Sequence, residues 1–324
     1  MLSRTAEHLF WMGRHIERAE NTARMLDVTY RMRLLPASIS QPMEPWAQPW
    51  AVPLITTGLA SDYYALYRDL TEQNVLEFLV SNPDNPSSIV NCLRQARENA
   101  RTVRGAITSE MWESLNSTWM EQGSVAPETL SPALVGSYFE QIKQRSHMFR
   151  GVTVGTALRD EAFYFVRLGT FLERADNTAR ILDVKYHILL PSPQDVGGAQ
   201  DYYQWGSLLR SVSAFEAYRK IYRDIIHPRK VAELLLLRND MPRSLRNCTA
   251  EMYRVLQSVA GGTGREAVRQ AGELMARLEF ARMDDIMAAG LHEYLLDFLE
   301  RTGALGAEIQ TSFFASPETQ ALVA

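Results

Sequence analysis

Apolar residues recur at spacings of three and four along most of the chain, which is the periodicity of amphipathic helices. In the first such stretch, residues 2–35, Leu9, Met12, Ile16 and Leu26 lie on one stripe, and Pro36 ends the stretch. The alternation that predicts β-strands is sustained nowhere. Further helices are predicted over residues 85–107, 110–120, 132–149, 159–190, 205–226, 228–238, 242–259, 265–278 and 284–302. The pattern predicts an all-α fold of helical bundles.

Proline, glycine and small polar residues separate these helices. They concentrate in residues 35–53, 122–132, 191–201 and 261–264, which we expect to be loops. The stretch "GVTVG", residues 151–155, is expected to link two parts of the chain. At the second predicted helix, Asn85 is the expected N-cap and Pro86 the first helical residue.

The chain contains an internal duplication. "ERAENTARMLDV", residues 17–28, returns as "ERADNTARILDV", residues 173–184, with ten of twelve positions identical. The same offset of 156 residues places Pro86, Ser88, Asn91 and Cys92 on Pro242, Ser244, Asn247 and Cys248. Two copies are too few for a solenoid. We therefore predict two helical halves, residues 1–155 and 156–324, which pack face to face around a pseudo-twofold axis as one body.

One polar helix face is retained in both copies. Glu17, Asn21 and Arg24 recur as Glu173, Asn177 and Arg180, although other positions of the same helix have changed. An ordinary exposed face tolerates substitution at little cost in stability. Something therefore restrains this face in both halves, and we expect that it is not bathed in bulk water.

Two interpretations of the polar face remain open. In the first, each long helix is buried on all sides, and its carboxylate, amide and guanidinium groups must satisfy one another. In the second, the two sets line a cleft between the halves, with Glu17 and Glu173 as catalytic acid–base groups. Arginine forks in that cleft would bind a carboxylate or a phosphate. The candidate substrate- or anion-binding residues are Arg14, Arg18, Asn21, Arg24, Arg174, Asn177 and Arg180.

Composition narrows the class of protein. The chain has 324 residues, of which 46% are hydrophobic and 22% charged, as in soluble globular proteins. A net charge of −4 gives no reason to expect binding to nucleic acid or to an anionic membrane. No apolar run is long enough to span a bilayer, and the N-terminus does not read as a signal peptide. We therefore expect a cytoplasmic protein.

The sequence lacks the motifs of several common kinds of catalytic site. The six histidines form no HExxH motif, and neither a Walker-type phosphate loop nor a GxGxxG motif occurs. "GGTG", residues 261–264, is interpreted as a helix connector. Cys92 and Cys248 lie on apolar helix faces and are expected to be core residues. The sequence predicts no metal site and no cofactor.

A partner surface is predicted on the second helix. Arg94, Arg97, Arg101 and Arg104 follow one another at helical spacing and form a basic stripe. The stripe is either a solvated face or a surface for an anion or an acidic partner. It is absent from the second copy. Trp46, in a proline-rich segment, is a further candidate for docking a partner. The C-terminal stretch from residue 312, with two phenylalanines, could pack on a second copy of the chain.

Three long motifs resemble those of the bacterial alpha-E domain proteins. They are "MLSRTAEHLFWMGRHIERAENTARMLDV" at the N-terminus, "DNPSSIVNCLRQARENARTVRGAITSEMWESLN" at residues 84–116, and "ERADNTARILDV" in the second copy. Proteins of this family are typically encoded beside a circularly permuted ATP-grasp protein, and often beside a transglutaminase-like protein. The resemblance implies a non-ATP-binding helical partner of an ATP-grasp ligase that forms amide bonds. The alternatives are a stand-alone enzyme or anion-binding protein with the Glu/Asn/Arg cleft, and a structural scaffold.

Overall fold

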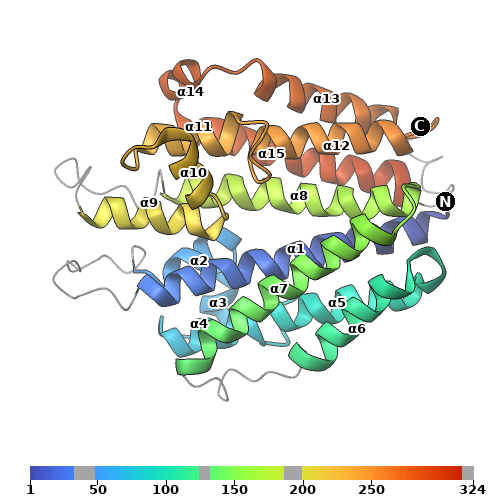
Figure 1. Cartoon of the computed structure of the whole chain (residues 1–324), viewed down its shortest axis with the longest axis horizontal. Coiled ribbons are helices and arrows are strands. Elements are labelled where there is room, and N and C mark those ends of the chain that lie inside the picture. Colours follow the sequence, from blue (N-terminus) through green and yellow to red (C-terminus); the bar gives the residue numbers. More distant parts are fainter. Residues whose placement is uncertain (33–47, 124–131, 186–198, 316–324) are drawn as a thin grey trace.

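Two long helices cross at the centre of the molecule, α1 (Ser3–Met32) and α8 (Glu161–Asp183) (Figure 1). The computed structural model describes residues 1–32, 48–123, 132–185 and 199–315, and every regular element in these ranges is helical. The all-α prediction is confirmed.

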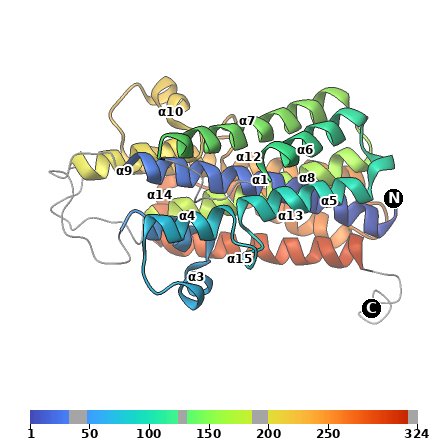
Figure 2. The same ribbon diagram turned by 90° about the horizontal axis from the view of Figure 1, so that it is seen from below.

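The remaining helices surround the central pair. The first half of the chain contributes α2 (Ala51–Thr57), α3 (Ala60–Leu66), α4 (Glu72–Val80), α5 (Ile89–Thr102), α6 (Ser109–Gln122) and α7 (Pro132–Thr156). The second half contributes α9 (Ala199–Ser211), α10 (Phe215–Tyr222), α11 (Pro228–Leu237), α12 (Leu245–Val259), α13 (Arg265–Glu279), α14 (Met283–Ala289) and α15 (Leu291–Ile309). A short 3₁₀ helix lies at Arg104–Ala106 and a short π-helix at Gln310–Phe314. The longer helices run along the long axis of the molecule (Figure 2).

Corresponding helices occupy corresponding places around the central pair. Helices α5 and α7 pack on α1, whereas α12 and α15 pack on α8. Adding 156 to the bounds of α5 gives 245–258, which is α12 to within one residue. The same shift places α4 on α11, α6 on α13 and most of α7 on α15.

The central helices approach very closely at two glycines. An ideal Cβ atom built on Gly13 would lie 2.2 Å from the carbonyl oxygen of Val166, and one on Gly169 would lie 2.0 Å from that of Phe10. The two contacts exchange when residue numbers are shifted by 156. Because each glycine meets backbone rather than a movable side chain, both positions must lack a Cβ for the helices to cross at this distance.

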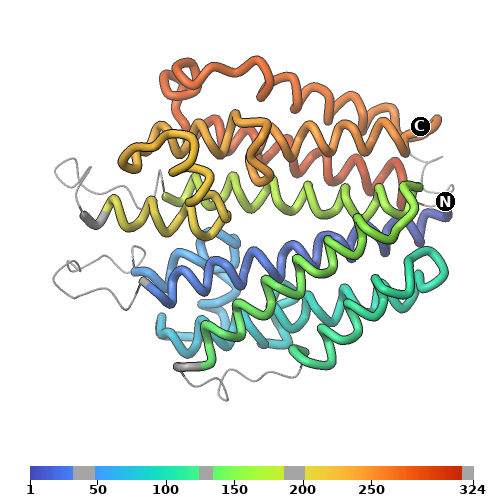
Figure 3. The backbone as a smooth tube through the Cα atoms, viewed as in Figure 1, coloured from blue at the N-terminus to red at the C-terminus, as the bar shows by residue number. Residues whose placement is uncertain are grey.

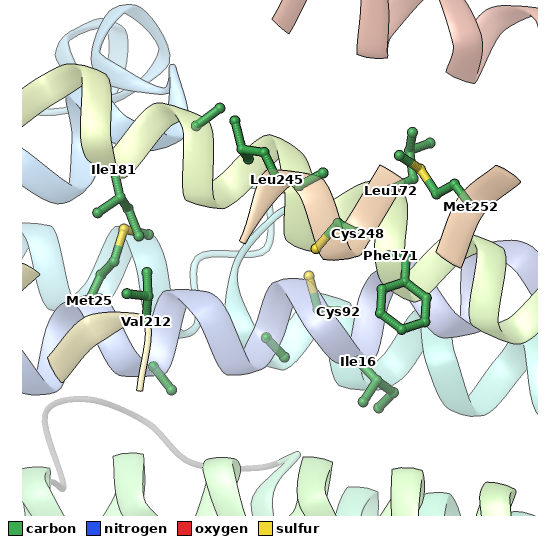
Figure 4. Close-up of a cluster of buried hydrophobic side chains, with 14 of the residues drawn as sticks. Ile16, Met25, Cys92, Phe171, Leu172, Ile181, Val212, Leu245, Cys248 and Met252 are labelled. Atoms are coloured by element: carbon green, nitrogen blue, oxygen red, sulfur yellow. The ribbon is translucent and has the colours of Figure 1, made fainter. Parts of the chain in front are cut away.

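One hydrophobic core extends through both halves of the sequence. Figure 4 shows Cys92 and Cys248 within it, and both are fully buried. Burial raises the pKa of each thiol to about 12, so neither is a nucleophile near neutral pH. Phe313 and Phe314 also pack in this core, against Phe165. Both contacts lie within the chain, and packing of the stretch from residue 312 on a second copy stays a prediction, because residues 316–324 lie outside the described residues.

Several predicted helix boundaries are corrected by the structure. The expected helix at 205–226 is two helices, because Ser213 adopts a positive φ of 54° between α9 and α10. The expected helix at 284–302 likewise breaks at Gly290, whose φ is 100°. Ser88 rather than Asn85 caps α5, since its hydroxyl accepts from the Asn91 amide.

The predicted linker at residues 151–155 is the last turn and a half of α7. Figure 3 follows the chain from α7 through a short turn into α8 at one end of the molecule. The second copy therefore begins at a tight helical turn, and α8 starts where the side chain of Asp160 caps the amide of Phe163.

Candidate functional site

The retained polar face is buried on α1, whereas on α8 only Glu173 is buried and Asn177 and Arg180 are half-exposed. Glu17, Glu20 and Asn21 on α1 are at most 3% exposed, and Glu173 and Arg174 on α8 are nearly as buried. Because α1 also buries its apolar stripe, it is enclosed on almost all sides. Carboxylates and guanidinium groups at such depth must be paired, since an isolated charge there would cost several kcal/mol.

Glutamate–arginine pairs of the two central helices bind each other reciprocally. Arg18 donates from Nε to Oε1 of Glu173 at 2.6 Å and from Nη2 to Oε2 at 3.0 Å. Arg174 donates from Nε to Oε1 of Glu17 at 2.8 Å and from Nη2 to Oε2 at 2.9 Å. Each is a two-point fork, the arrangement in which guanidinium and carboxylate groups bind most strongly. Each fork joins the two halves of the sequence.

Glu17, which accepts the fork from Arg174, belongs to a buried ionic cluster that we call the Glu17 cluster. Arg243, from the turn before α12, donates to Oε1 of Glu17 and to Oε1 of Glu20, both at 2.8 Å. It also donates to Oδ1 of Asn21 at 2.8 Å. Arg150 of α7 donates to both glutamates. The members of the Glu17 cluster are Glu17, Glu20, Asn21, Arg24, Arg150, Arg174 and Arg243.

Glu173 belongs to a second set, the Glu173 cluster, which surrounds a cavity. Arg14 donates from Nε to Oε2 of Glu173 at 2.8 Å, in addition to the fork from Arg18. Arg180 binds Asp176 through two hydrogen bonds of 2.8 and 3.2 Å. The cavity has a volume of about 220 Å³ and opens toward solvent. The members of the Glu173 cluster are Arg14, Arg18, Glu173, Asp176, Asn177 and Arg180, and Asn21 and Ser87 also line the cavity.

The surrounding guanidinium groups keep the buried glutamates ionised. Burial alone raises the pKa of Glu173, but the charges and hydrogen bonds of Arg18 and Arg14 outweigh it and bring the pKa to about 2. Burial likewise opposes ionisation of Glu17, and Arg174 and Arg243 hold its pKa below the usual value. Carboxylates with such low pKa values are weak proton acceptors near neutral pH.

His15 lies beside the Glu173 cluster and makes the fold sensitive to acid. Burial, followed by the charge of Arg18, lowers the pKa of His15 from 6.5 to about 4. Between these values the unfolded chain binds more protons than the folded chain, so stability falls as pH falls from 6.5 toward 4. Glu173 has a depressed pKa, so the stability it contributes is lost only below its ordinary value of 4.5.

We therefore expect His15→Phe to remove an acid-sensitive part of the stability. The phenyl ring keeps an aromatic contact with Trp11, whose ring centre lies 5.5 Å from that of His15, and it cannot take up a proton. The free energy of unfolding, measured in urea, falls between pH 6.5 and about pH 5 in the unmodified chain. In His15→Phe we expect this fall to be smaller by about 2 kcal/mol. The same measurement on His227→Asn, at a half-exposed site, is the control. An unchanged pH slope in His15→Phe would contradict the assignment.

The structure divides the predicted site residues between the two clusters. Glu17, Arg24 and Arg174 lie in the Glu17 cluster, whereas Arg14, Arg18, Glu173, Asn177 and Arg180 line the cavity, and Asn21 touches both. Glu17, Asn21 and Arg24 bind other residues instead of satisfying one another along the helix. Arg24 donates to Glu20 at 2.8 Å, and Asn21 accepts from Arg243.

Two of the most connected arginines were not among the predicted residues. Arg243 and Arg150 correspond to Ser87 and Gly306 at the offset of 156, so the repeat gave no signal for either. Glu20 and Asp176 did carry a signal, because acidity is kept at that position in both copies. A comparison of the two copies that looked only for retained charge would have identified Glu20 and Asp176.

The predicted basic stripe lies away from both clusters. Arg97 and Arg104 approach the ring of Trp112, each with its guanidinium carbon 5.7 Å from the ring centre. Arg97 and Arg101 both pair with Glu98, and Arg94 donates to Asn91. Arg94, Arg101 and Arg104 are exposed. Trp46 lies outside the described residues.

The described residues hold no group of three or more histidine, cysteine or carboxylate side chains placed to bind a metal ion. Within the same ranges, none of the helices combines the length and the apolar character needed to cross a bilayer.

Comparison with known proteins identifies related sequences. The Alpha-E family model, described as a predicted alpha-helical domain with a conserved ER motif, matches residues 1–314. Both central helices carry a Glu-Arg pair, Glu17–Arg18 and Glu173–Arg174, and these are the residues joined by the reciprocal forks. Uncharacterized proteins of Mycobacterium bovis and Mycobacterium tuberculosis are 24% identical over 316 residues. The match covers 91% of this chain but 35% of each relative, so the chain spans about a third of their length. No solved structure matches the chain.

Proposed function

The chain belongs to the Alpha-E family, and from this premise we propose that it is a helical, non-ATP-binding partner of a circularly permuted ATP-grasp ligase. The system would form amide bonds, since ATP-grasp enzymes activate a carboxylate and pass it to an amine. The geometry that supports this role is the reciprocal pairing of Glu17 with Arg174 and of Glu173 with Arg18. Carboxylates held ionised by two-point forks stabilise a fold or position a ligand better than they transfer protons.

The absence of any recognised phosphate loop from the sequence also favours a partner that supplies ATP chemistry. Because ATP-dependent ligation draws on cytoplasmic ATP, we place the proposed system in the cytoplasm. A transglutaminase-like protein is a second proposed partner, on the ground of the family resemblance alone.

We also propose that residues 1–155 and 156–324 are duplicated halves related by a pseudo-twofold axis between α1 and α8. The exchange of Gly13 and Gly169 contacts supports this relation, as does the exchange of the two forks. The axis brings corresponding polar faces together at the centre of one body. Catalytic roles for Glu17 and Glu173 become the weaker alternative under this arrangement, because each carboxylate is committed to arginines from the other helix.

The exposed part of the basic stripe is the proposed docking surface. Arg94 and Arg101 present guanidinium groups to solvent on α5, and an acidic surface of the ligase would complement them. The corresponding positions of α12 are Ala250 and Gln257, so only one half of the molecule carries this surface.

Co-expression with the ATP-grasp protein encoded beside the gene tests the proposal. We expect the two chains to co-purify and to sediment as one complex. Arg101→Glu should weaken the complex about tenfold, because rim charges change association rates and their salt dependence. Gln257→Glu, at the corresponding exposed position of α12, is the matched control and should leave the affinity unchanged. Separate sedimentation of the two unmodified chains, or a mixture in which only copies of this chain associate, would overturn the proposal.

A further inference from the structure

The cavity of the Glu173 cluster lies where the Glu17 cluster holds the side chain of Arg243. Arg243 and Ser87 occupy the same position of the repeat. Arg243 donates to Glu17, Glu20 and Asn21. The counterparts of these three acceptors are Glu173, Asp176 and Asn177, and all three line the cavity together with Ser87. The serine side chain is too short to reach as Arg243 does, so in the first half this place is left open.

The hydrogen-bond acceptors around the cavity receive fewer hydrogen bonds than the corresponding acceptors of the Glu17 cluster. Glu20 accepts from Arg24, Arg150 and Arg243, whereas Asp176 accepts only from Arg180 among the described residues. Oδ1 of Asn177 likewise has no donor in the described parts of the chain, although Oδ1 of Asn21 accepts from Arg243. The donor that these acceptors lack among the described residues corresponds to the guanidinium group of Arg243 in the Glu17 cluster.

Donors around the cavity are also left without acceptors. Nδ2 of Asn21 is buried and has no acceptor among the described residues, in a residue that is only 3% exposed and lines the cavity. Nδ2 of Asn177 is likewise buried, with no acceptor in the described ranges of the chain. An unpaired buried donor costs about 1–3 kcal/mol, which a ligand with an acceptor oxygen would offset.

Charge on the lining favours an acidic group beside these donors. Three arginines, Arg14, Arg18 and Arg180, face two carboxylates, so the lining carries one surplus positive charge. The terminal nitrogens of Arg14 make no hydrogen bond within the described residues, since only its Nε binds Glu173. The ligand must therefore bring an acceptor as well as a donor.

Size limits the ligand further. A volume of about 220 Å³ equals the share of about seven water molecules in the liquid, at about 30 Å³ each. It falls below the range of about 300–1,000 Å³ that is usual for drug-sized ligands. The cavity therefore suits a small molecule.

We propose that this cavity binds a small zwitterion, of which a free α-amino acid is the simplest. Its ammonium group lies toward Glu173, Asp176 and Oδ1 of Asn177, in the place that Arg243 takes in the other half. Its carboxylate lies toward Arg14 and Nδ2 of Asn21. The inference rests on the proposed function only for the ligand's role, namely that the bound amino acid supplies the amine to be ligated.

Calorimetric titration of the full chain tests the proposal. The twenty standard L-amino acids are each titrated at about 10 mM, which detects dissociation constants in the millimolar range. We expect at least one to bind saturably. Its N-acetyl derivative, which lacks the ammonium, and its amide, which lacks the carboxylate, should each bind at least about tenfold more weakly. Absence of binding by every amino acid, or equal binding of either blocked derivative, would overturn the proposal.

Ser87→Arg supplies the missing guanidinium from the chain itself. We expect this variant to lose amino-acid binding at least about tenfold while keeping or raising its melting temperature, since Arg243 shows that such a side chain fits the corresponding place. Ser87→Ala, which leaves the cavity open, is the matched control and should still bind. Unchanged affinity in folded Ser87→Arg would contradict the assignment, and if that variant fails to fold, the blocked derivatives still decide.

The same variant separates this inference from the proposed function. Ser87→Arg should still co-purify with the ATP-grasp protein, because Ser87 precedes the N-cap of α5 and its replacement leaves Arg94 and Arg101 in place. Loss of amino-acid binding with the complex intact supports both proposals. Failure of every amino acid to bind, with the complex intact, would leave the proposed partner role standing and remove the ligand assignment.

Discussion

Gly169→Ala is expected to lower the free energy of unfolding by about 3 kcal/mol or more, as is Gly13→Ala. A methyl group at Gly169 would lie 2.0 Å from the carbonyl oxygen of Phe10, and one at Gly13 would lie 2.2 Å from that of Val166. A backbone oxygen cannot rotate away, so α1 and α8 would have to separate. Separation would also lengthen the reciprocal forks of Glu17 and Glu173. Chemical unfolding monitored by circular dichroism measures the effect.

Gly151→Ala is the matched control for these substitutions. Gly151 lies within α7, is exposed, and has no neighbouring atom within 4 Å of an added Cβ. Alanine there should stabilise the helix by about 0.5–1 kcal/mol, because glycine loses more backbone entropy on folding. If Gly169→Ala has the same free energy of unfolding as the unmodified chain, the packing of α1 on α8 does not depend on this close approach.

Helix periodicity and the repeat predicted most of the fold. The helices α6, α11 and α13 begin and end within two residues of the predicted bounds, because each has an apolar face and a clear start or stop signal, whereas α5 is shorter than the predicted helix at both ends. The helices α2, α3 and α4 were not predicted. Other predictions failed where a single residue with positive φ interrupts a continuous apolar pattern. Ser213 and Gly290 do so, and the spacing of apolar residues continues on both sides of each.

The candidate site was predictable in part. Retention of Glu17, Asn21 and Arg24 in the second copy indicated a restrained polar face, and the structure buries that face on α1. Its partners were not predictable, because Arg243 and Arg150 approach from distant helices and have no repeat counterparts. Sequence spacing reports neighbours on one helix, whereas these ion pairs depend on how helices cross.

The two interpretations of the polar face now apply to different parts of the molecule. The Glu17 cluster fits the account of a buried network, because arginines from α7, α8 and the turn before α12 fill the space around Glu17. The Glu173 cluster keeps the same fork but encloses a cavity. A duplicated structural element that lost one arginine, at Ser87, would gain room for a ligand without losing the crossing of the helices.

Glu17→Gln is expected to destabilise the protein by about 3–5 kcal/mol, the range for removing one partner of a buried ion pair. The substitution leaves Arg174, Arg243 and Arg150 facing a neutral amide at a site that is 1% exposed. The amide can also keep only part of the fork, because its nitrogen is a donor. Thermal unfolding followed by calorimetry should show a clearly lower melting temperature near neutral pH.

Comparison with two further variants shows whether burial is the cause. Glu113→Gln, at an exposed site on α6, should change stability by no more than about 0.5 kcal/mol. Glu173→Gln should have an intermediate effect, because solvent entering the cavity can solvate Arg14 and Arg18 once the carboxylate is gone. Glu17→Gln could instead have the melting temperature of the unmodified chain and lose only the activity of the ligase complex. In that case Glu17 acts on a substrate, and the buried-network account of this cluster fails.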